Sequence, residues 1–146
     1  MLPKSVLRCK DMRGFSLGEL LVAAGIFGVL AAVAVPQFIA QQPSLRLNGA
    51  ARQVFSEIMS ARMRAVNENT TYTVTFPNNH TIQIAGATTR TVDIQTLYSD
   101  VTLSSSAGTI NLSSRGTADG AATITISNGA GTKTVSIKIT GTATIS

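Results

Sequence analysis

One uninterrupted apolar stretch near the N-terminus constrains this chain more than any other feature. The stretch runs from Phe15 to Val35, and Pro36 follows it. An α-helix rises 1.5 Å per residue, so this stretch would span roughly 30 Å, about the hydrocarbon thickness of a bilayer. The nearest basic residues precede it, and the positive-inside rule then keeps the N-terminus cytoplasmic. We therefore expect one membrane-spanning helix with the rest of the chain on the other side.

Glu19 is an acidic residue inside this apolar stretch. A carboxylate in a membrane-spanning helix costs about 2.5–3.5 kcal/mol on insertion scales. An ordinary secretory signal peptide, cleaved near Ala32-Val33-Ala34, would leave this acid unexplained, and so would a plain signal anchor. A charged residue at such a position indicates a functional site, and its partner has to be found.

The residues around Glu19 form a specific pattern. The string Gly14-Phe15-Ser16-Leu17-Gly18-Glu19-Leu20-Leu21-Val22 follows a basic leader and opens the apolar helix. This pattern resembles the prepilin signature of type IV pilins and type II secretion pseudopilins. The resemblance implies that a prepilin peptidase cuts between Gly14 and Phe15, and that the new amine of Phe15 is N-methylated to methylphenylalanine. Gly18 departs from the usual pattern and weakens the local helix by up to ~1 kcal/mol relative to Ala.

The same resemblance implies a role for Glu19 in assembly. In this family the matching acid pairs with the N-terminal amine of a neighbouring subunit. Cleavage before Phe15 creates that cation, and neutralising a buried anion in lipid favours assembly.

The resemblance also implies partners and a location. The expected partners are the prepilin peptidase, other pilin or pseudopilin subunits, an assembly platform protein with its ATPase, and inner-membrane lipid before assembly. The subunit is expected in the bacterial inner membrane as a single-pass protein with a periplasmic head, and then in the filament.

Two further features of the first helix bear on packing. Small residues that allow close helix approach in membranes recur at every fourth position: Ala24, Gly28 and Ala32. The alternative is that Ala and Gly are simply common in such helices. Pro36 lacks an amide hydrogen and is expected to end or kink the apolar segment. Pro43 and Asn48-Gly49 predict that the chain after it is a poor continuous helix.

Helical periodicity returns near residue 50. Apolar residues then share one face at helical spacing: Ala51, Val54, Phe55, Ile58, Ala61 and Ala65. This face predicts an amphipathic helix packed on the sheet of a head. Three arginines lie mostly elsewhere on it, and we interpret them as a solvated flank rather than an anion site: Arg52, Arg62 and Arg64.

After Asn69 the pattern changes to the alternation typical of half-buried strands. Turns are predicted at Pro77-Asn78-Asn79 and at Asn128-Gly129 with Gly131. The predicted strands are Tyr72–Phe76, Thr81–Ala85, Thr91–Leu97, Thr109–Leu112, Ala122–Ser127, Lys133–Thr140 and Ala143–Ser146. A helix followed by strands predicts an α+β fold. A long N-terminal helix, transmembrane in its first half and amphipathic in its second, would pack on a small antiparallel β-rich head.

These patterns together predict the organisation of the chain. We expect a leader at 1–14, a transmembrane and filament-core helix at 15–35, an amphipathic helix region at 36–68, and a β-rich periplasmic or extracellular head at 69–146.

A second, looser resemblance covers the head. The string from Leu47 to Ala65, and Ser114-Arg115-Gly116-Thr117 with the late Gly141, resemble the GspH/FimT type of minor pilins and pseudopilins. Some members of that group carry basic residues after the late glycine and bind DNA for uptake. Here Gly141 is followed by Thr142-Ala143-Thr144, so that function is not carried over.

Charge gives little support to nucleic-acid binding. The net charge is +5, but residues 1–13 hold four basic residues against one acidic, a net +3. The remaining eight basic and six acidic residues give +2, and aromatic residues make up only 5%. The basicity is therefore interpreted as a topology signal, and no nucleic-acid partner is expected.

Catalytic and metal sites are not indicated either. The single cysteine, Cys9, lies in the leader, and the single histidine, His80, lies beside a predicted turn. The aspartates of the head form no calcium-type loop: Asp93, Asp100 and Asp119. We expect no catalytic residue, metal or cofactor, and therefore not an enzyme. The predicted function is a structural subunit, a minor pilin or pseudopilin, of a type IV pilus or type II secretion pseudopilus. The alternatives are a DNA-uptake or adhesive minor pilin whose head binds a ligand and, more remotely, a membrane-anchored or secreted enzyme.

Overall fold

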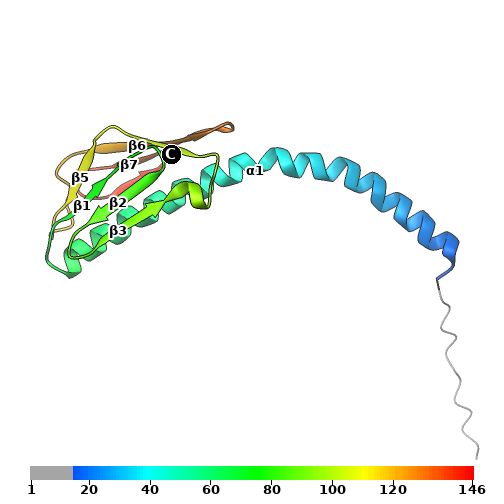
Figure 1. The fold of residues 1–146 in the computed structure, drawn as a ribbon, viewed down its shortest axis with the longest axis horizontal. Helices are drawn as coiled ribbons and strands as arrows, with labels where there is room; N and C mark the ends of the chain where they lie inside the picture. The colour runs from blue at the N-terminus through cyan, green and yellow to red at the C-terminus, as the bar shows by residue number, and fades with distance from the viewer. Residues whose placement is uncertain (1–14) are drawn as a thin grey trace, which may run out of the picture. The chain divides into compact units, whose positions relative to one another are not determined.

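A computed structural model describes residues 15–146; the expected leader, with Gly14 at its end, lies outside them. The described chain forms one long α-helix, α1 (Leu17–Asn67), and a β-rich head (Figure 1). It divides into two compact units, with the boundary between Ile39 and Ala40. The strands and the 3-10 turn are β1 (Tyr72–Thr75), β2 (Thr81–Ala85), β3 (Thr89–Asp93), η1 (Ile94–Thr96), β4 (Thr102–Ser105), β5 (Thr109–Leu112), β6 (Ala122–Asn128), β7 (Gly131–Ile137) and β8 (Ala143–Ile145).

Helix α1 continues through both prolines. It is helical from Leu17 to Asn67, so the prediction that the helix ends at Pro36 is wrong, and so is the prediction of a poor helix around Pro43 and Asn48-Gly49. Each proline removes one N–H donor, but the neighbouring Ala, Gln and Leu residues favour helix. A kink at Pro36 stays a prediction.

The first unit is an exposed apolar helix. Every side chain from Phe15 to Ala40 is exposed, and α1 is the one described helix long and apolar enough to cross a membrane. Water solvates such a surface poorly, and soluble monomers rarely leave so large an apolar surface uncovered. A bilayer or other apolar helices must therefore cover this segment.

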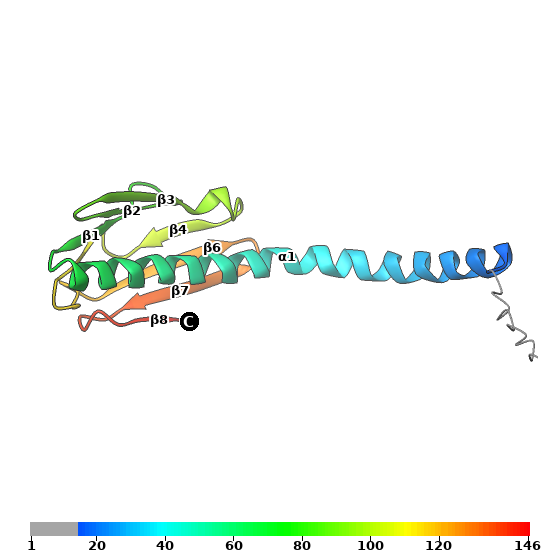
Figure 2. The same ribbon diagram turned by 90° about the horizontal axis from the view of Figure 1, so that it is seen from below.

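The second unit, residues 40–146, builds its head from two antiparallel sheets. Their strand orders are β3-β2-β1-β5 and β4-β6-β7-β8. In Figure 2 the second half of α1 lies across the strands, with β2 and β3 on one side and β7 and β8 on the other. Main-chain hydrogen bonds link the two parts of the head through loops that flank the strands. Leu103 N of β4 donates to Asn79 O in the turn before β2 at 2.6 Å, and Ala118 N, between β5 and β6, donates to Ile139 O just after β7 at 2.9 Å.

One apolar core fills the space between α1 and both sheets. The predicted face of the helix is confirmed: it buries Ala51, Val54, Ile58, Ala61 and Ala65, and Phe55 is partly buried. Leu47 and Ala50, which were not predicted, are buried as well. Facing them are side chains at alternate positions along the strands, chiefly Tyr72, Val74, Ile82, Ile110, Leu112, Ile124, Ile126, Val135 and Ile137. Each large side chain buried in this way contributes about 1.5–3 kcal/mol relative to exposure.

Polar contacts fix α1 on the head from Pro43 onward. At the β6–β7 hairpin, Asn128 Nδ2 donates to Pro43 O at 2.8 Å and to Asp100 Oδ2 at 3.1 Å. Arg46 forms an ion pair with Asp100 at 3.5 Å. The carbonyl of Pro43 thus accepts a hydrogen bond from the β6–β7 hairpin, which ties this part of α1 to the head.

Gly49 has a packing role in this same part of the helix. The ring of Tyr98 lies directly on it, and a Cβ at this position would be 2.7 Å from Tyr98 Cε1. The glycine that the sequence marked as a helix-weakening residue therefore permits a close contact between α1 and the loop after η1.

The strand predictions differ from the structure in three places. The predicted strand Lys133–Thr140 begins earlier, at Gly131, and ends at Ile137. The predicted strand 91–97 begins earlier, at Thr89, and ends at Asp93. Asp93 Oδ1 accepts from Gln95 N at 2.9 Å and starts the turn η1 instead. Strand β4 (Thr102–Ser105) was not predicted. Only Leu103 in it is buried, and the two serines that follow give no alternation of apolar and polar residues.

Candidate functional site

The start of α1 is defined by Ser16. Its Oγ accepts from Glu19 N at 3.2 Å, and its carbonyl accepts from Leu20 N at 3.2 Å. Serine is a preferred N-cap, because its side chain satisfies a backbone donor that has no intrahelical partner. Glutamate three residues later matches the spacing of a capping box. The prepilin-like string therefore also encodes a sharp helix start just after Phe15.

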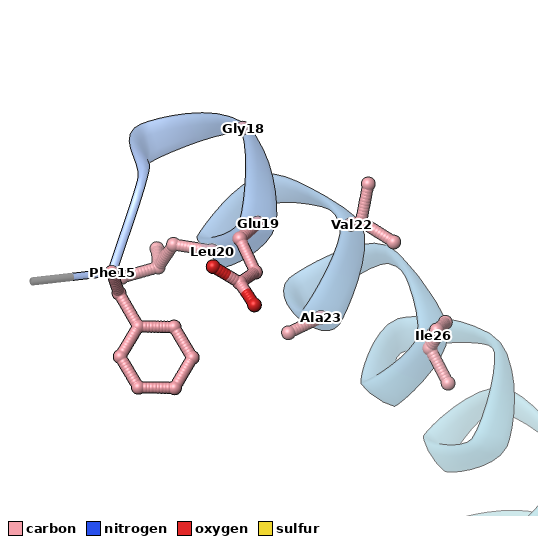
Figure 3. A pocket seen from close by; sticks show the side chains of 7 residues that line it. All are labelled: Phe15, Gly18, Glu19, Leu20, Val22, Ala23 and Ile26. Atoms are coloured by element: carbon pink, nitrogen blue, oxygen red, sulfur yellow. The ribbon is translucent and has the colours of Figure 1, made fainter. Parts of the chain in front are cut away.

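The carboxylate of Glu19 lies in the first turn of this helix. It borders an open hollow of about 720 Å³ lined by Phe15, Gly18, Glu19, Leu20, Val22, Ala23 and Ile26. Figure 3 shows the carboxylate and the Phe15 ring on the same side of the helix start. Among the described residues, the Glu19 side chain accepts no hydrogen bond and forms no ion pair.

The surroundings of Glu19 decide what its negative charge costs in free energy. The helix N-terminus favours a nearby negative charge by about 0.3–1 kcal/mol. Insertion of an acid into a membrane costs about 2.5–3.5 kcal/mol. The helix dipole therefore offsets only a minor part of this cost, and a positive group close to Glu19 would stabilise the helix in an apolar environment.

Other predicted assembly residues lie on the same exposed helix. Phe15 precedes the first helical residue and is 82% exposed. Ala24, Gly28 and Ala32 are all exposed, and a Cβ built on Gly28 would meet no atom within 4 Å. The described chain thus places nothing on the face that these small residues share.

Arg62 of α1 binds two loops of the head. Its Nε donates to Gly116 O at 2.8 Å, and its Nη2 donates to Thr140 O at 3.3 Å. Gly116 and Gly141 have φ values of +77° and +75°, which favour glycine. A Cβ on Gly141 would overlap the carbonyl oxygen of Gly116. The Ser114–Thr117 string and the late glycine therefore form one loop pair that Arg62 holds together.

This contact corrects one interpretation from the sequence. Arg62 is partly buried and belongs to the loop pair, so it is not part of a solvated flank. Arg52 and Arg64 are exposed, as expected of such a flank.

Glu57 is a buried acid that sequence reasoning missed. Its side chain is 6% exposed and faces β3 from the polar flank of α1. Oε1 accepts from Arg90 Nη2 at 3.1 Å and from Gln53 Nε2 at 2.8 Å. The only available signal was its position, next to the apolar residue Ile58 on the helix. With both donors in place, the pair joins α1 to β3 and has a structural role.

The remaining polar candidates also serve the fold. His80 Nδ1 lies 3.0 Å from Asn79 Oδ1 in the turn before β2. Asp93 caps η1, Asp100 binds Arg46 and Asn128, and Asp119 accepts from the main-chain and side-chain nitrogens of Asn111. In the part of the chain that the structure describes, no three His, Cys, Asp or Glu side chains are grouped to hold a metal ion.

Tyr72 carries the clearest change in acidity. The ring is buried, and its hydroxyl donates to Glu68 Oε2 at 2.7 Å. This hydrogen bond, together with desolvation and the negative charge of Glu68, raises the pKa of the Tyr72 phenol above its ordinary value. The contact ties the end of α1 to β1.

Comparison with known proteins supports a pilin-like identity. The family described as "Type II transport protein GspH" matches residues 50–142. Two crystal structures of the type IV minor pilin FimU from Pseudomonas aeruginosa resemble the chain at 17% identity. Their TM-scores are 0.57 and 0.59, with 68% of this chain and 91% or 87% of that chain covered. A search among curated protein sequences finds no match.

The family match covers α1 from Ala50 onward and the seven strands β1 to β7, and it ends in the loop before β8; it includes the Arg62 loop pair. The structural likeness to FimU supports the same α+β arrangement, with a long N-terminal helix packed on antiparallel sheets. The family is structural, and its members assemble with other pilin or pseudopilin subunits. On these grounds, the chain belongs to the GspH family and is a minor pilin or pseudopilin subunit.

Proposed function

We propose that this subunit enters its filament through the charge of Glu19. The peptide bond between Gly14 and Phe15 is cut by a prepilin peptidase, and the new amine of Phe15 is N-methylated. The amine of a neighbouring subunit then neutralises Glu19. The observation that carries this proposal is the exposed Glu19 carboxylate, which has no partner within the described chain although it lies in an apolar helix.

The exposed helix supports two successive states of the subunit, one in the membrane and one in the filament. Residues 15–35 first span the inner membrane, with the N-terminus cytoplasmic and the head, residues 69–146, in the periplasm. Residues 36–68 link the two parts. A platform protein and its ATPase then move the subunit into a pilus or pseudopilus, where the helices of other subunits replace lipid around residues 15–35.

Small residues favour this second stage. Ala24, Gly28 and Ala32 project little from one face of α1, and each is exposed. In apolar surroundings helices associate through close packing rather than through the hydrophobic effect, so such a face allows close approach. Within this proposal the subunit performs no covalent chemistry and needs no cofactor.

The Glu19→Ala variant tests the proposal. It should be cut at Gly14 like the wild type, because the cleaved bond is unchanged, yet it should be lost from the sheared filament fraction. Gln37→Ala, an exposed polar change in the same helix, is the matched control and should assemble normally. Normal incorporation of the Glu19→Ala chain would contradict the proposed pairing.

A further inference from the structure

Asparagine is followed by glycine at two places in this chain, Asn48-Gly49 and Asn128-Gly129, and alanine follows each pair. The side-chain amide of an asparagine can be attacked by the main-chain nitrogen of the next residue. Glycine has no Cβ and lets its backbone approach other groups closely, so it obstructs this attack least. Because the two pairs have nearly the same local sequence, the fold decides whether they differ in reactivity.

The first pair lies inside helix α1. A helical N–H donates to the carbonyl oxygen four residues earlier, so the helix holds Gly49 N in a hydrogen bond of its own. The ring of Tyr98 also lies directly on Gly49, 2.7 Å from where a Cβ would stand. The helix must therefore open locally before Gly49 N can attack the amide of Asn48.

The second pair lies at the β6–β7 hairpin, where β6 ends at Asn128 and β7 begins at Gly131. Gly129 and Ala130 form the exposed turn between the two strands. Within the described chain Gly129 N donates no hydrogen bond, and a Cβ built on Gly129 would meet no atom within 4 Å. The fold therefore leaves this nitrogen able to approach the amide of Asn128.

The hydrogen bonds of the Asn128 side chain bear on the reaction in two ways. Its Oδ1 accepts from Ala130 N at 2.9 Å, and this donor would stabilise the negative charge that the oxygen gains during the attack. Its Nδ2 donates to Pro43 O and to Asp100 Oδ2, and both bonds are lost when Nδ2 leaves. Attack by Gly129 N thus fits the folded hairpin, and departure of Nδ2 breaks the contact with α1.

We propose that Asn128 is a site of spontaneous covalent modification, and that its deamidation loosens the contact between Pro43 of α1 and the head. Gly129 N attacks Cγ of Asn128 and forms a bond to it, which closes a five-membered imide ring. The bond between Cγ and Nδ2 breaks, and Nδ2 leaves as ammonia together with the proton of Gly129 N. Water then opens the ring at either carbonyl and leaves an aspartate or an isoaspartate at position 128.

The new carboxylate meets unfavourable surroundings. One of its oxygens takes the place of Nδ2, which lies 2.8 Å from Pro43 O and 3.1 Å from Asp100 Oδ2. Acceptors then face one another with no proton between them, and the two carboxylates repel each other. An isoaspartate also adds a methylene to the main chain at the residue that pairs with Gly131. This inference goes beyond the proposed function and does not depend on it, because the contact lies within one chain.

Peptide mass spectrometry of the full chain in detergent tests where deamidation occurs. At mildly alkaline pH the folded chain should lose the Asn128 amide at least about tenfold faster than the Asn48 amide, because only the latter needs the helix to open first. In denaturant the two amides should be lost at similar rates, since their local sequences match. The proposal is overturned if the folded chain loses the Asn48 amide equally fast, or keeps the Asn128 amide while the denatured chain is fully converted.

The Gly129→Ala variant tests the route of the reaction. The added Cβ obstructs the attack but meets no neighbouring atom, so this chain should fold like the wild type and deamidate at position 128 about tenfold more slowly. Gly108→Ala is the matched control, because a Cβ there also meets nothing within 4 Å, and it should keep the wild-type rate. Equal rates in Gly129→Ala and the wild type would exclude cyclisation onto Gly129 N and overturn the proposal.

Amide hydrogen exchange tests the consequence for α1. Asn128→Asp reproduces the aspartate product, and exchange in the helix segment that includes Leu47 should rise about tenfold over the wild type. The rise should exceed that in Asn128→Ala, which removes the donors without adding a charge. Combining Asn128→Asp with Asp100→Asn exchanges the amide and the carboxylate, and should restore most of the protection. Equal exchange in Asn128→Asp and Asn128→Ala, or no recovery in the double variant, would overturn the proposed loosening.

Discussion

At the scale of single residues, the proposed cleavage requires a small side chain before Phe15. Changing Gly14 to Leu should block processing, because a bulky residue then stands next to the bond to be cut. We expect a persistent full-length band on immunoblots of membranes. Gly18→Ala is the control, since a Cβ there would meet only Ser16 Oγ at 3.8 Å. Unchanged processing of the Gly14→Leu chain would remove Gly14 from the proposed site.

Gly141 should be among the least replaceable residues of the head. A Cβ there overlaps the Gly116 carbonyl and lies 2.9 Å from Arg62 Nε, in a conformation with φ +75°. Gly141→Ala should therefore destabilise the full chain in detergent by at least about 2 kcal/mol, through strain and a displaced Arg62. Thermal unfolding followed by circular dichroism measures this loss. Gly129→Ala, where nothing lies within 4 Å, should unfold like the wild type.

Tyr72 makes stability depend on alkaline pH. Its pKa is raised by the hydrogen bond to Glu68, so the folded chain holds the phenol proton more tightly than the unfolded chain does. This contribution is complete below about pH 10, the ordinary tyrosine pKa, and is lost as the pH rises through the folded value. Tyr72→Phe should reduce the fall in unfolding free energy above pH 10, measured by denaturant titration. Tyr98→Phe should keep that fall; equal curves for Tyr72→Phe and the wild type would contradict the assignment.

At the scale of elements, the sequence predicts the helix face and the strands that have a periodic pattern. It does not predict the features that depend on contacts between residues far apart in the chain. The apolar face from Ala51 to Ala65 was correct because helical spacing is a local signal. The helix was expected to end or kink at Pro36 because proline is a local breaker, and it continues to Asn67. The contact of Asn128 with Pro43, the packing of Tyr98 on Gly49, and the division into two sheets join residues far apart in the chain. No local sequence pattern predicts these contacts or the division into two sheets.

The candidate site shows the same difference between residues with a local signature and residues with distant partners. Phe15 and Glu19 could be identified from the sequence because a whole signature surrounds them, and their roles stay predictions. Arg62 was interpreted as solvated because its partners, Gly116 and Thr140, lie 54 and 78 residues away. Glu57 was missed for the same reason, since Arg90 lies 33 residues away.

The hydrogen bonds that Asn128 donates to Pro43 O and Asp100 Oδ2 should stabilise the packing of α1 on the head. Asn128→Ala removes donors to Pro43 O and Asp100 Oδ2, at a cost of about 1 kcal/mol for a typical hydrogen bond. Amide hydrogen exchange should therefore rise in the helix segment that includes Leu47, while the core around Ile58 stays protected. Thr132→Ala, on the same hairpin, should leave the exchange pattern unchanged. Equal protection of this segment in Asn128→Ala and the wild type would show that apolar packing alone holds it.

At the scale of the whole molecule, the two units need different surroundings, because one buries its apolar side chains and the other exposes them. The head buries one apolar core beneath two sheets, whereas the segment from Phe15 to Ala40 leaves every side chain exposed. A chain cut after Ala34, like an ordinary secreted protein, would lose most of the exposed apolar surface and Glu19 with it. A chain cut after Gly14 keeps both, so it stays in lipid until other helices cover it.

These two routes give different mature proteins, and mass spectrometry of the filament fraction distinguishes them. We expect a chain that begins at N-methylated Phe15, with eight basic and six acidic residues remaining. Before assembly the same chain should resist alkaline extraction from membranes, because residues 15–35 occupy the bilayer. A soluble periplasmic chain beginning at Val35 would contradict the proposal, since it contains neither the amine of Phe15 nor the carboxylate of Glu19. Filaments built from chains that retain residues 1–14 would contradict it as well, because the amine beside Glu19 would never form.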